Sequence, residues 1–267
     1  MLKIMTYNIL EGTGYERAER LDIVIDVVHQ VEPDILAIQE ANHFDNNDYE
    51  RLKKLSGSVG LPYYALALGT RRNSGRQFHV ATLSRYPFKQ QQRLNHFYHA
   101  SLRTAIQSDH GLISIVNAHL HPHNEEERKK EVNRMLGAQK PHQNTIILGD
   151  LNALSPHDSY EDLLPLLPDY LKKSFTKEGH IACDAITVLL NAGYHDTAAE
   201  TGINHVKTMP TPLSKHARDG LTFRIDYVFV SSSLKNNIQK TEVLKSPVIE
   251  KASDHYPYWI ILDVDAL

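Results

Sequence analysis

Short apolar segments of strand length recur along the whole chain and constrain its fold more than any other feature. Several of them are apolar at consecutive positions, so both of their faces are suited to burial. An open antiparallel sheet alternates apolar and polar residues, whereas stacked sheets with outer helices bury both faces. The segments span Lys3–Asn8, Ile35–Gln39, Tyr63–Leu68, His79–Leu83, Leu112–Ala118, Thr145–Leu148, Ile225–Val230 and Tyr258–Leu262.

Helical spacing of apolar residues appears between these segments. Residues 21–31 form an amphipathic helix that Pro33 ends. Residues 125–138 combine a narrow apolar stripe with a run of charged residues, which indicates a solvated helix face. Shorter helices are expected over residues 48–55, 159–167 and 185–192.

Nothing in the sequence divides the chain into parts. It contains no Gly/Ser linker, low-complexity tract or internal repeat, and 41% of its 267 residues are hydrophobic, enough for a sizeable core. We therefore expect one α/β catalytic domain over residues 1–267. The longest irregular region, residues 201–221, is of a length that is usually functional or mobile.

Charge and cysteine content narrow the class of protein. Cys183 is the single cysteine, which excludes an internal disulfide or thiolate cluster and suits a reducing compartment. The first residues contain no unbroken apolar run, so we expect a cytoplasmic protein without stable membrane insertion. We also expect a monomer. The formal charge of -3 neither requires nor excludes a nucleic-acid substrate.

Asp150 and Asn152 end the most informative segment, an apolar strand followed by Gly149. Alternation places the carboxylate and the amide on one side of the chain. A carboxylate there can act as general base for water, and an amide can orient that water or donate to a phosphate oxygen. A simple turn at the end of a strand would use the same residue types.

Asp254 and His255 precede the last strand, and an imidazolium in that place can stabilise a phosphate or protonate a leaving group. Asp226 lies within an apolar strand, where a carboxylate needs a partner. It could orient His255 and keep it protonated, or it could form a salt bridge with Arg224 or Arg218.

Three further polar residues follow predicted strands. Glu40 could bind a hard divalent cation, and Asn8 ends the first strand in a similar place. His119 ends another buried strand, and its neighbours His121 and His123 raise a zinc site as a further possibility. No zinc-binding helix motif accompanies these histidines.

Seven motifs, in order along the chain, resemble the endonuclease/exonuclease/phosphatase superfamily, which has a deoxyribonuclease I-like fold. The motifs are Thr6-Tyr7-Asn8, Gln39-Glu40, Leu83-Ser84-Arg85-Tyr86-Pro87, Asn117-Ala118-His119-Leu120, Gly149-Asp150-Leu151-Asn152, Asp226-Tyr227-Val228 and Ser253-Asp254-His255. The resemblance implies a four-layer sandwich, in which two mixed β-sheets pack face to face with helices outside. It also implies hydrolysis of a phosphate ester with Mg²⁺ or Mn²⁺.

The same resemblance assigns roles residue by residue. Glu40 would be the main metal ligand, with Asn8 nearby and Asp254 as an additional ligand. Asp150 would position or activate water, and Asn152 would hold the phosphate. His255, oriented by Asp226, would stabilise charge, and His119 would touch the phosphate or aid the leaving group. Arg103 would either bind the phosphate or be structural.

The resemblance leaves the substrate open. Abasic-site endonucleases usually carry tyrosine where this chain has His119, so the sequence looks closer to deoxyribonuclease-like and sphingomyelinase-like members. We expect a nuclease-like phosphodiesterase. The alternatives are a lipid phosphoesterase, similar to sphingomyelinases or phosphoinositide phosphatases, and a catalytically silent binding module. Substrate selection is expected in residues 201–221 and in the loop 69–77, which carries Arg71, Arg72 and Arg76. Phe97 and Tyr98 are expected in a core or turn role.

Overall fold

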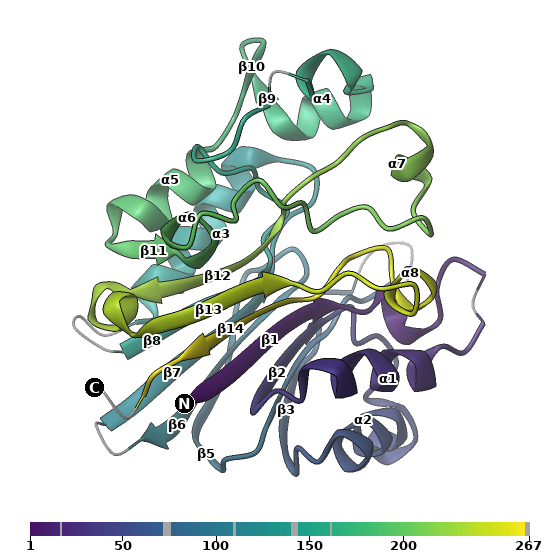
Figure 1. The fold of residues 1–267 in the computed structure, drawn as a ribbon, viewed down its shortest axis with the longest axis vertical. Coiled ribbons are helices and arrows are strands. Elements are labelled where there is room, and N and C mark those ends of the chain that lie inside the picture. The colour runs from purple at the N-terminus through teal and green to yellow at the C-terminus, as the bar shows by residue number, and fades with distance from the viewer. Residues whose placement is uncertain (17, 72–75, 109–110, 140–143, 161, 265–267) are drawn as a thin grey trace.

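Two six-stranded sheets form the centre of the molecule in a computed structural model (Figure 1), which describes residues 1–16, 18–71, 76–108, 111–139, 144–160 and 162–264. The first sheet has the order β13-β14-β1-β2-β4-β3, with β1 and β2 parallel and the other neighbours antiparallel. Its strands are β1 (Leu2–Asn8), β2 (Ile35–Gln39), β3 (Tyr63–Ala67), β4 (Val80–Ser84), β13 (Ile238–Val243) and β14 (Tyr258–Leu262).

The second sheet has the order β11-β12-β8-β7-β6-β5, and its only parallel pair of described strands is β7 and β8. Its strands are β5 (Phe88–Leu94), β6 (Ala100–Ser108), β7 (Gly111–His119), β8 (Asn144–Asp150), β11 (Tyr194–Asp196) and β12 (Asp226–Ser231). A small hairpin of β9 (Thr176–Lys177) and β10 (His180–Ile181) stands apart from both sheets.

Apolar side chains from the facing sides of the two sheets fill the space between them. Ile4 and Ile35 of the first sheet belong to one buried cluster with Ile115 and Leu148 of the second. The helices α1 (Leu21–Val31), α2 (Asn46–Val59) and α8 (Ile249–Ala252) cover the outer side of the first sheet. The helices α3 (Glu125–Gly137) and α5 (Asp184–Asn191) cover the second. This arrangement confirms the expected four-layer α/β sandwich.

Shorter helices lie in the connections between these layers. They are η1 (Leu10–Gly12), η2 (Leu164–Leu166), α4 (Asp169–Phe175), α6 (Thr197–Glu200), α7 (Lys215–Arg218) and η3 (Ser232–Asn237). None of the helices in the described part of the chain combines the length and apolar character needed to cross a lipid bilayer.

One predicted helix is wrong in its position. Residues 159–167 were expected to be helical, but the described part of this stretch contains only the single turn η2, and the helix α4 begins after Pro168. Pro165 cannot donate a backbone hydrogen bond, and Leu167, which precedes Pro168, has an extended conformation with ψ of 122°. The two prolines therefore delay the helix.

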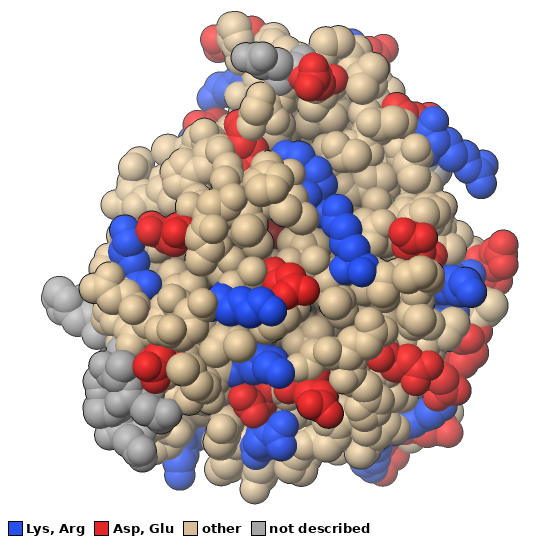
Figure 2. All heavy atoms as spheres, viewed as in Figure 1, with Lys and Arg blue, Asp and Glu red and all other residues tan. Residues whose placement is uncertain are grey.

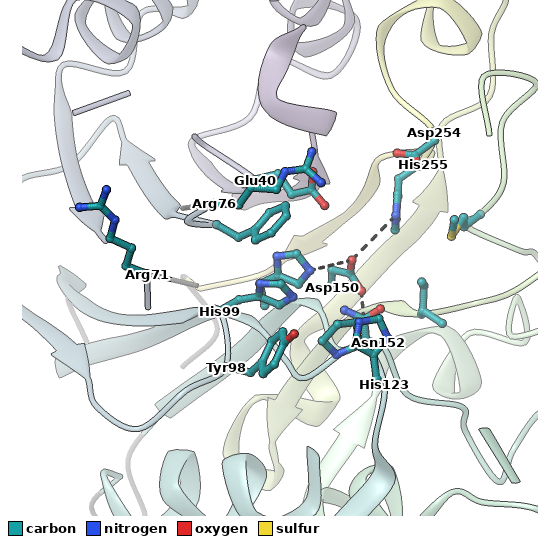
Figure 3. A pocket seen from close by; sticks show the side chains of 15 residues that line it. Glu40, Arg71, Arg76, Tyr98, His99, His123, Asp150, Asn152, Asp254 and His255 are labelled. Carbon is teal, nitrogen blue, oxygen red and sulfur yellow. Dashed lines mark hydrogen bonds and ion pairs between the residues drawn. The ribbon is translucent and has the colours of Figure 1, made fainter. Parts of the chain in front are cut away.

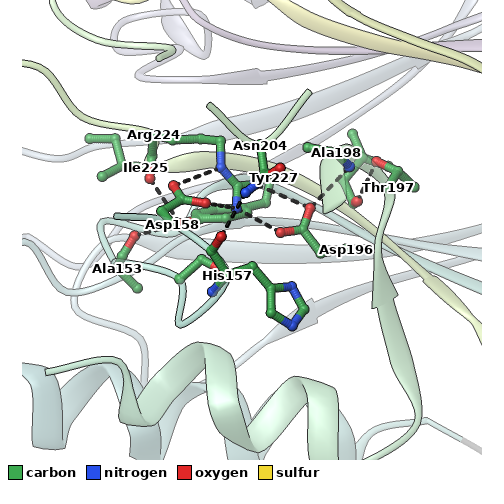
Figure 4. Close-up of polar contacts among 12 residues, drawn as sticks. Ala153, His157, Asp158, Asp196, Thr197, Ala198, Asn204, Arg224, Ile225 and Tyr227 are labelled. Carbon is green, nitrogen blue, oxygen red and sulfur yellow. Dashed lines mark hydrogen bonds and ion pairs between the residues drawn. The ribbon is translucent and has the colours of Figure 1, made fainter. Parts of the chain in front are cut away.

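A buried ion-pair network anchors the start of β12 (Figure 4). Arg224 lies two residues before the strand and is 1% exposed. Its guanidinium donates to both carboxylate oxygens of Asp158, at 2.8 and 3.0 Å, and to both of Asp196, at 2.7 and 3.1 Å. A bidentate pair on each side satisfies most of the donors of the buried cation. The network thereby holds Asp226, two residues further on, in a defined place.

Gly149 permits the close approach of β7 and β8 just before Asp150. Its φ angle is 137°, and a Cβ atom built on it would lie 1.9 Å from the carbonyl oxygen of Ala118, its register partner on β7. Any side chain would push the two strands apart. The strand end that carries Asp150 thus depends on glycine at this position.

Gly149→Ala is therefore expected to lower the free energy of unfolding by about 3 kcal/mol, because it adds a backbone clash to a disfavoured φ angle. Urea denaturation followed by circular dichroism measures this change. Gly57→Ala is the matched control, since Gly57 lies in α2 with no atom within 4 Å of the added Cβ. Equal losses in the two variants would contradict the proposed close approach.

Candidate active site

The polar residues expected from strand ends lie together at one edge of the sandwich (Figure 3). β1 and β2 are parallel, as are β7 and β8, so the carboxyl ends of each pair point the same way. β12 and β14 run antiparallel to β8 and β1, which brings the residues before or at their starts to the same edge. This edge collects Asn8, Glu40, His119, Asp150, Asn152, Asp226, Asp254 and His255. Figure 3 labels Glu40, Asp150, Asn152, Asp254 and His255 among them.

Asp150 is the centre of the contacts between these residues. Its Oδ2 atom accepts a hydrogen bond of 3.0 Å from Nδ2 of Asn8, which comes from the other sheet. Its Oδ1 atom accepts one of 3.0 Å from the backbone N–H of Asn152. Burial raises the pKa of Asp150 to about 7, although the nearby His255 lowers it. The carboxylate is thus a candidate base for chemistry near neutral pH.

His255 is paired with Asp226, as the first of the two readings of that carboxylate predicted. Nδ1 of His255 lies 2.8 Å from Oδ2 of Asp226, and Nε2 lies 3.8 Å from Oδ2 of Asp150. Burial alone would lower the pKa of His255, but Asp226, Asp150 and Asp254 together raise it well above its usual value. The imidazole is therefore positively charged at neutral pH. Arg224 is committed to Asp158 and Asp196 instead.

His119 has the opposite electrostatic character. Burial, followed by the charge of His255, lowers the pKa of His119 to about 3, so its ring is neutral. Its Nε2 atom lies 3.4 Å from Oδ2 of Asp150, and its ring stacks on that of His99 at a centroid distance of 4.0 Å. Within the described residues, its Nδ1 atom has no hydrogen-bond partner. The site therefore contains one charged and one neutral imidazole.

Glu40 and Asp254 add two more carboxylates to the cluster. Burial and the charge of Asp254 raise the pKa of Glu40 to about 8. Glu40 Oε1 lies 3.4 Å from Nδ2 of Asn8, and Oδ2 of Asp254 accepts a hydrogen bond of 2.6 Å from the hydroxyl of Tyr15. Oδ1 of Asp254 is buried without a partner among the described residues. Such a group of buried oxygens has the chemistry that hard divalent cations require.

One set of acidic and imidazole side chains among the described residues has metal-ligand spacing. Ligand atoms of Asp150, Asp226 and His255 lie within 4.8 Å of one another. The hydrogen bond between His255 and Asp226 already engages two of these three residues. Among the described residues, His119, His121 and His123 do not form such a group, so the structure gives no support to the zinc site considered from the sequence.

Arg103 and Tyr98 take places that the sequence did not decide. Arg103 does not line the cavity, and its contacts support the structural one of its two expected roles: it donates to Ser114 and to the carbonyl of Ala138 at 3.1 Å each, tying β6 to β7 and to the residue after α3. Phe97 is buried as expected, but Tyr98 lines the cavity. The contact of Tyr15 with Asp254 joins residues 239 positions apart and has no local signal in the sequence.

The cluster opens into a cavity of about 700 Å³. Both segments expected to select substrate reach it: Arg71 and Arg76 from the loop 69–77, and Met209 from the region 201–221. Arg72 lies outside the described residues. On the face drawn in Figure 2, basic and acidic side chains are interspersed among the described residues, in keeping with the charge of -3.

Comparison with known proteins then decides the family. A family model described as the endonuclease/exonuclease/phosphatase family matches residues 5–255. The chain belongs to the endonuclease/exonuclease/phosphatase family. This confirms the resemblance inferred from the motifs and makes the protein a phosphoric ester hydrolase by class. Among curated proteins, no sequence matches the chain significantly.

Solved structures share the fold over almost the whole chain. An AP endonuclease from Archaeoglobus fulgidus has a TM-score of 0.71 and 22% identity, covering 98% of this chain and 100% of its own. A family protein from Leptotrichia buccalis C-1013-b has a TM-score of 0.69 and 16% identity with the same coverage. A 3′ phosphatase from Neisseria bound to a product DNA hairpin has a TM-score of 0.69, 17% identity and the same coverage. At these identities the likeness establishes the fold.

The pairing of His255 with Asp226 generates a prediction on pH. In metal-free protein, NMR is expected to show His255 titrating well above its usual pKa of 6.5, and Asp226→Asn is expected to move that titration to lower pH, because burial then dominates. Since the folded pKa is raised, the pair stabilises the protein fully below pH 6.5 and loses its effect as pH rises through the folded pKa. An unchanged His255 titration in the variant would contradict the pairing.

Proposed function

We propose that the protein is a Mg²⁺- or Mn²⁺-dependent phosphodiesterase of the nuclease-like kind, which hydrolyses its substrate by in-line attack of water. The observation that carries this proposal is the cluster around Asp150, which brings carboxylates, amides and a charged imidazole to one cavity. Two proteins with the same fold, an AP endonuclease and a 3′ phosphatase bound to a product DNA hairpin, support a nucleic-acid substrate. No expected catalytic position is missing, which disfavours a silent binding module.

Glu40, with Asn8 and Asp254, would hold the divalent cation. Three observations support this choice: Glu40 is a buried carboxyl with a pKa raised to about 8, Asp254 has a buried oxygen without a described partner, and Asn8 lies next to Glu40. A cation would offset the cost of burying these charges together. When bound, it supplies Lewis-acid stabilisation of charge on the phosphate oxygens.

The side chains of the chain itself account for the other requirements of the reaction. Asp150 would orient the attacking water and take its proton, held in place by the hydrogen bonds from Asn8 and Asn152. Asn152 lines the cavity and would donate to a phosphate oxygen, a role that suits a neutral amide.

The two histidines would have different roles toward the phosphate. His255, kept as an imidazolium by Asp226, would stabilise the negative charge that develops on the non-bridging oxygens. His119 is neutral and would touch the phosphate or the leaving oxygen through a ring N–H. The pair therefore places one full charge and one neutral donor beside the same carboxylate.

The wider setting is also a proposal. We propose that residues 1–267 act as one catalytic domain and as a monomer in the cytoplasm, and the single cysteine, Cys183, suits that reducing compartment. The substrate is a phosphate ester, for which a panel of single- and double-stranded DNA, abasic DNA, RNA, sphingomyelin and phosphoinositides with Mg²⁺ or Mn²⁺ gives the direct test. Hydrolysis of the lipids alone would favour a lipid phosphoesterase.

Asp150→Asn is expected to reduce metal-dependent hydrolysis of the preferred panel substrate by at least ~1,000-fold, because the variant keeps the size of the side chain but removes the base. The rate of product release at saturating Mg²⁺ measures the effect. Asp26→Asn is the matched control, since Asp26 is an exposed residue of α1 away from the cavity. Full activity of Asp150→Asn would overturn the role of that carboxylate.

Glu40→Gln is expected to weaken Mg²⁺ binding by about tenfold or more, because a neutral amide replaces a charged oxygen ligand. Isothermal titration calorimetry of the metal-free protein gives the dissociation constant without relying on turnover. Glu32→Gln, at an exposed position after α1, is the control and should bind like the unaltered protein. Absence of Mg²⁺ binding in the unaltered protein would favour a silent binding module.

A further inference from the structure

Aromatic and imidazole rings form one wall of the cavity, beside the proposed catalytic groups. We call this set the ring wall: Phe78, Tyr98, His99, His119 and His123, all of which line the cavity. His99 and His119 are stacked, with centroids 4.0 Å apart and planes 19° from parallel. Phe78 and Tyr98 each meet His99 edge to face, at 4.6 and 4.9 Å. The reaction proposed above needs no such surface apart from His119.

The ring wall is held in place from behind by α3. The buried carboxylate of Glu131 accepts a hydrogen bond of 2.5 Å from the backbone N–H of Tyr98 through one oxygen. Its other oxygen accepts one of 2.7 Å from the backbone N–H of His121. One side chain thus joins two of the segments that carry the rings, those at Tyr98 and His121. A surface fixed in this manner is preorganised for a ligand.

The space in front of the ring wall is larger than a phosphate and its metal require. The cavity measures about 700 Å³, within the range of pockets that enclose whole organic ligands. Met209 and Ile225 also line it and supply apolar surface. His119 belongs both to the ring wall and to the cluster around Asp150, at 3.4 Å from that carboxylate. A flat group held by the wall would therefore be part of the residue attached to the phosphate under attack.

Arg71 places a second anion-binding element at the same cavity. It lines the cavity and is exposed. Figure 3 shows it away from Asp254 and His255. Arg76 also lines the cavity, but its guanidinium is paired with Glu11 at 3.2 Å. Along a nucleic-acid strand, a flat base lies between one phosphate and the next. The cluster around Asp150, the ring wall and the guanidinium group follow the same order. Guanidinium groups and aromatic rings together are the usual means of holding single strands.

We propose that the ring wall is a stacking subsite for the base of an unpaired nucleotide next to the scissile phosphate, with Arg71 contacting a neighbouring phosphate of the strand. This inference rests on the proposed function and adds the substrate class, a nucleic acid with an unpaired residue. A lipid substrate would instead need apolar surface around the opening. None of the exposed large apolar side chains among the described residues lines the cavity.

The test compares two single-stranded oligonucleotides that differ only at the residue beside the cleaved phosphate, which carries a base in one and a tetrahydrofuran abasic analogue in the other. The ratio of their kcat/KM values with Mg²⁺ measures recognition of the base. The unaltered protein is expected to prefer the base-containing strand by about tenfold or more. Tyr98→Leu is expected to reduce this ratio about tenfold, and Tyr98→Phe, which keeps the ring, to retain it. Tyr63→Leu is the matched control, because Tyr63 is 42% exposed and does not line the cavity.

A second measurement reads stacking without turnover. A strand with 2-aminopurine at the same residue is titrated with protein in EDTA, and stacking is expected to quench its fluorescence with the unaltered protein and Tyr98→Phe but much less with Tyr98→Leu. Equal kcat/KM values for both strands in the unaltered protein, or an unchanged ratio and quenching in Tyr98→Leu, would overturn the stacking subsite while leaving the phosphodiesterase proposal intact. Hydrolysis of lipid phosphoesters with no action on either strand would also overturn it. No hydrolysis of any phosphate ester would overturn the proposed function itself.

Discussion

The carboxylate of Asp150 is buried at the place where the two sheets meet, and the arrangement of the site depends on its hydrogen bonds. Asn8 reaches it from the first sheet, the backbone of Asn152 from the chain beyond β8, and His119 and His255 lie within 4 Å. A buried carboxylate without such partners would be costly. The requirement to satisfy this one group therefore couples the relative position of the sheets to the geometry of the proposed reaction.

A buried network of amide and hydroxyl side chains lies inside the sandwich and supports the cluster around Asp150. Asn117 on β7 accepts a hydrogen bond of 2.8 Å from Gln39 on β2 and donates to the carbonyls of Ile38 and Ala81. Gln39 also pairs with Thr6 on β1. These groups lie one or two residues before Glu40, His119 and Asn8, so they hold the strands of both sheets directly beneath the cluster. Buried networks with all members satisfied specify one arrangement of the layers more sharply than apolar packing does.

The sequence predicted the parts of the fold and of the site that depend on periodicity. Apolar strands give the two sheets, and the polar residues that end them, such as Glu40 and Asp150, share an edge because parallel strands point the same way. The missed strand β5 is an edge strand whose central residues are polar and exposed, so it carries no burial pattern. β13 is likewise a partly exposed edge strand with polar residues in its centre. Strands without a run of apolar residues give no such pattern.

Contacts between distant loops could not be predicted from the sequence. Tyr15 meets Asp254 across 239 positions, the ring wall gathers residues near 78, 98, 119 and 123, and Glu131 on α3 holds two of its segments. Arg103 showed the converse: its charge suggested a phosphate contact, but its place on β6 turns it to Ser114 and the end of α3. Side-chain type predicts chemistry at strand ends because register fixes their position. On loops, tertiary packing decides where the same side chain points.

The groups proposed for catalysis and those proposed for substrate choice therefore lie on different parts of the fold. The groups proposed for the reaction stand on β1, β7, β8 and β12 or within four residues of a strand, where register and Gly149 hold them. The groups proposed for substrate choice stand largely between strands, and hydrogen bonds to Glu131 hold two of these segments, at Tyr98 and His121. Changes in these loops can alter the cavity without disturbing the strands, since loops tolerate substitution better than the layers they connect. The same sandwich is accordingly retained in proteins with 16% to 22% identity to this chain, and the ring wall is a feature that such variation can supply.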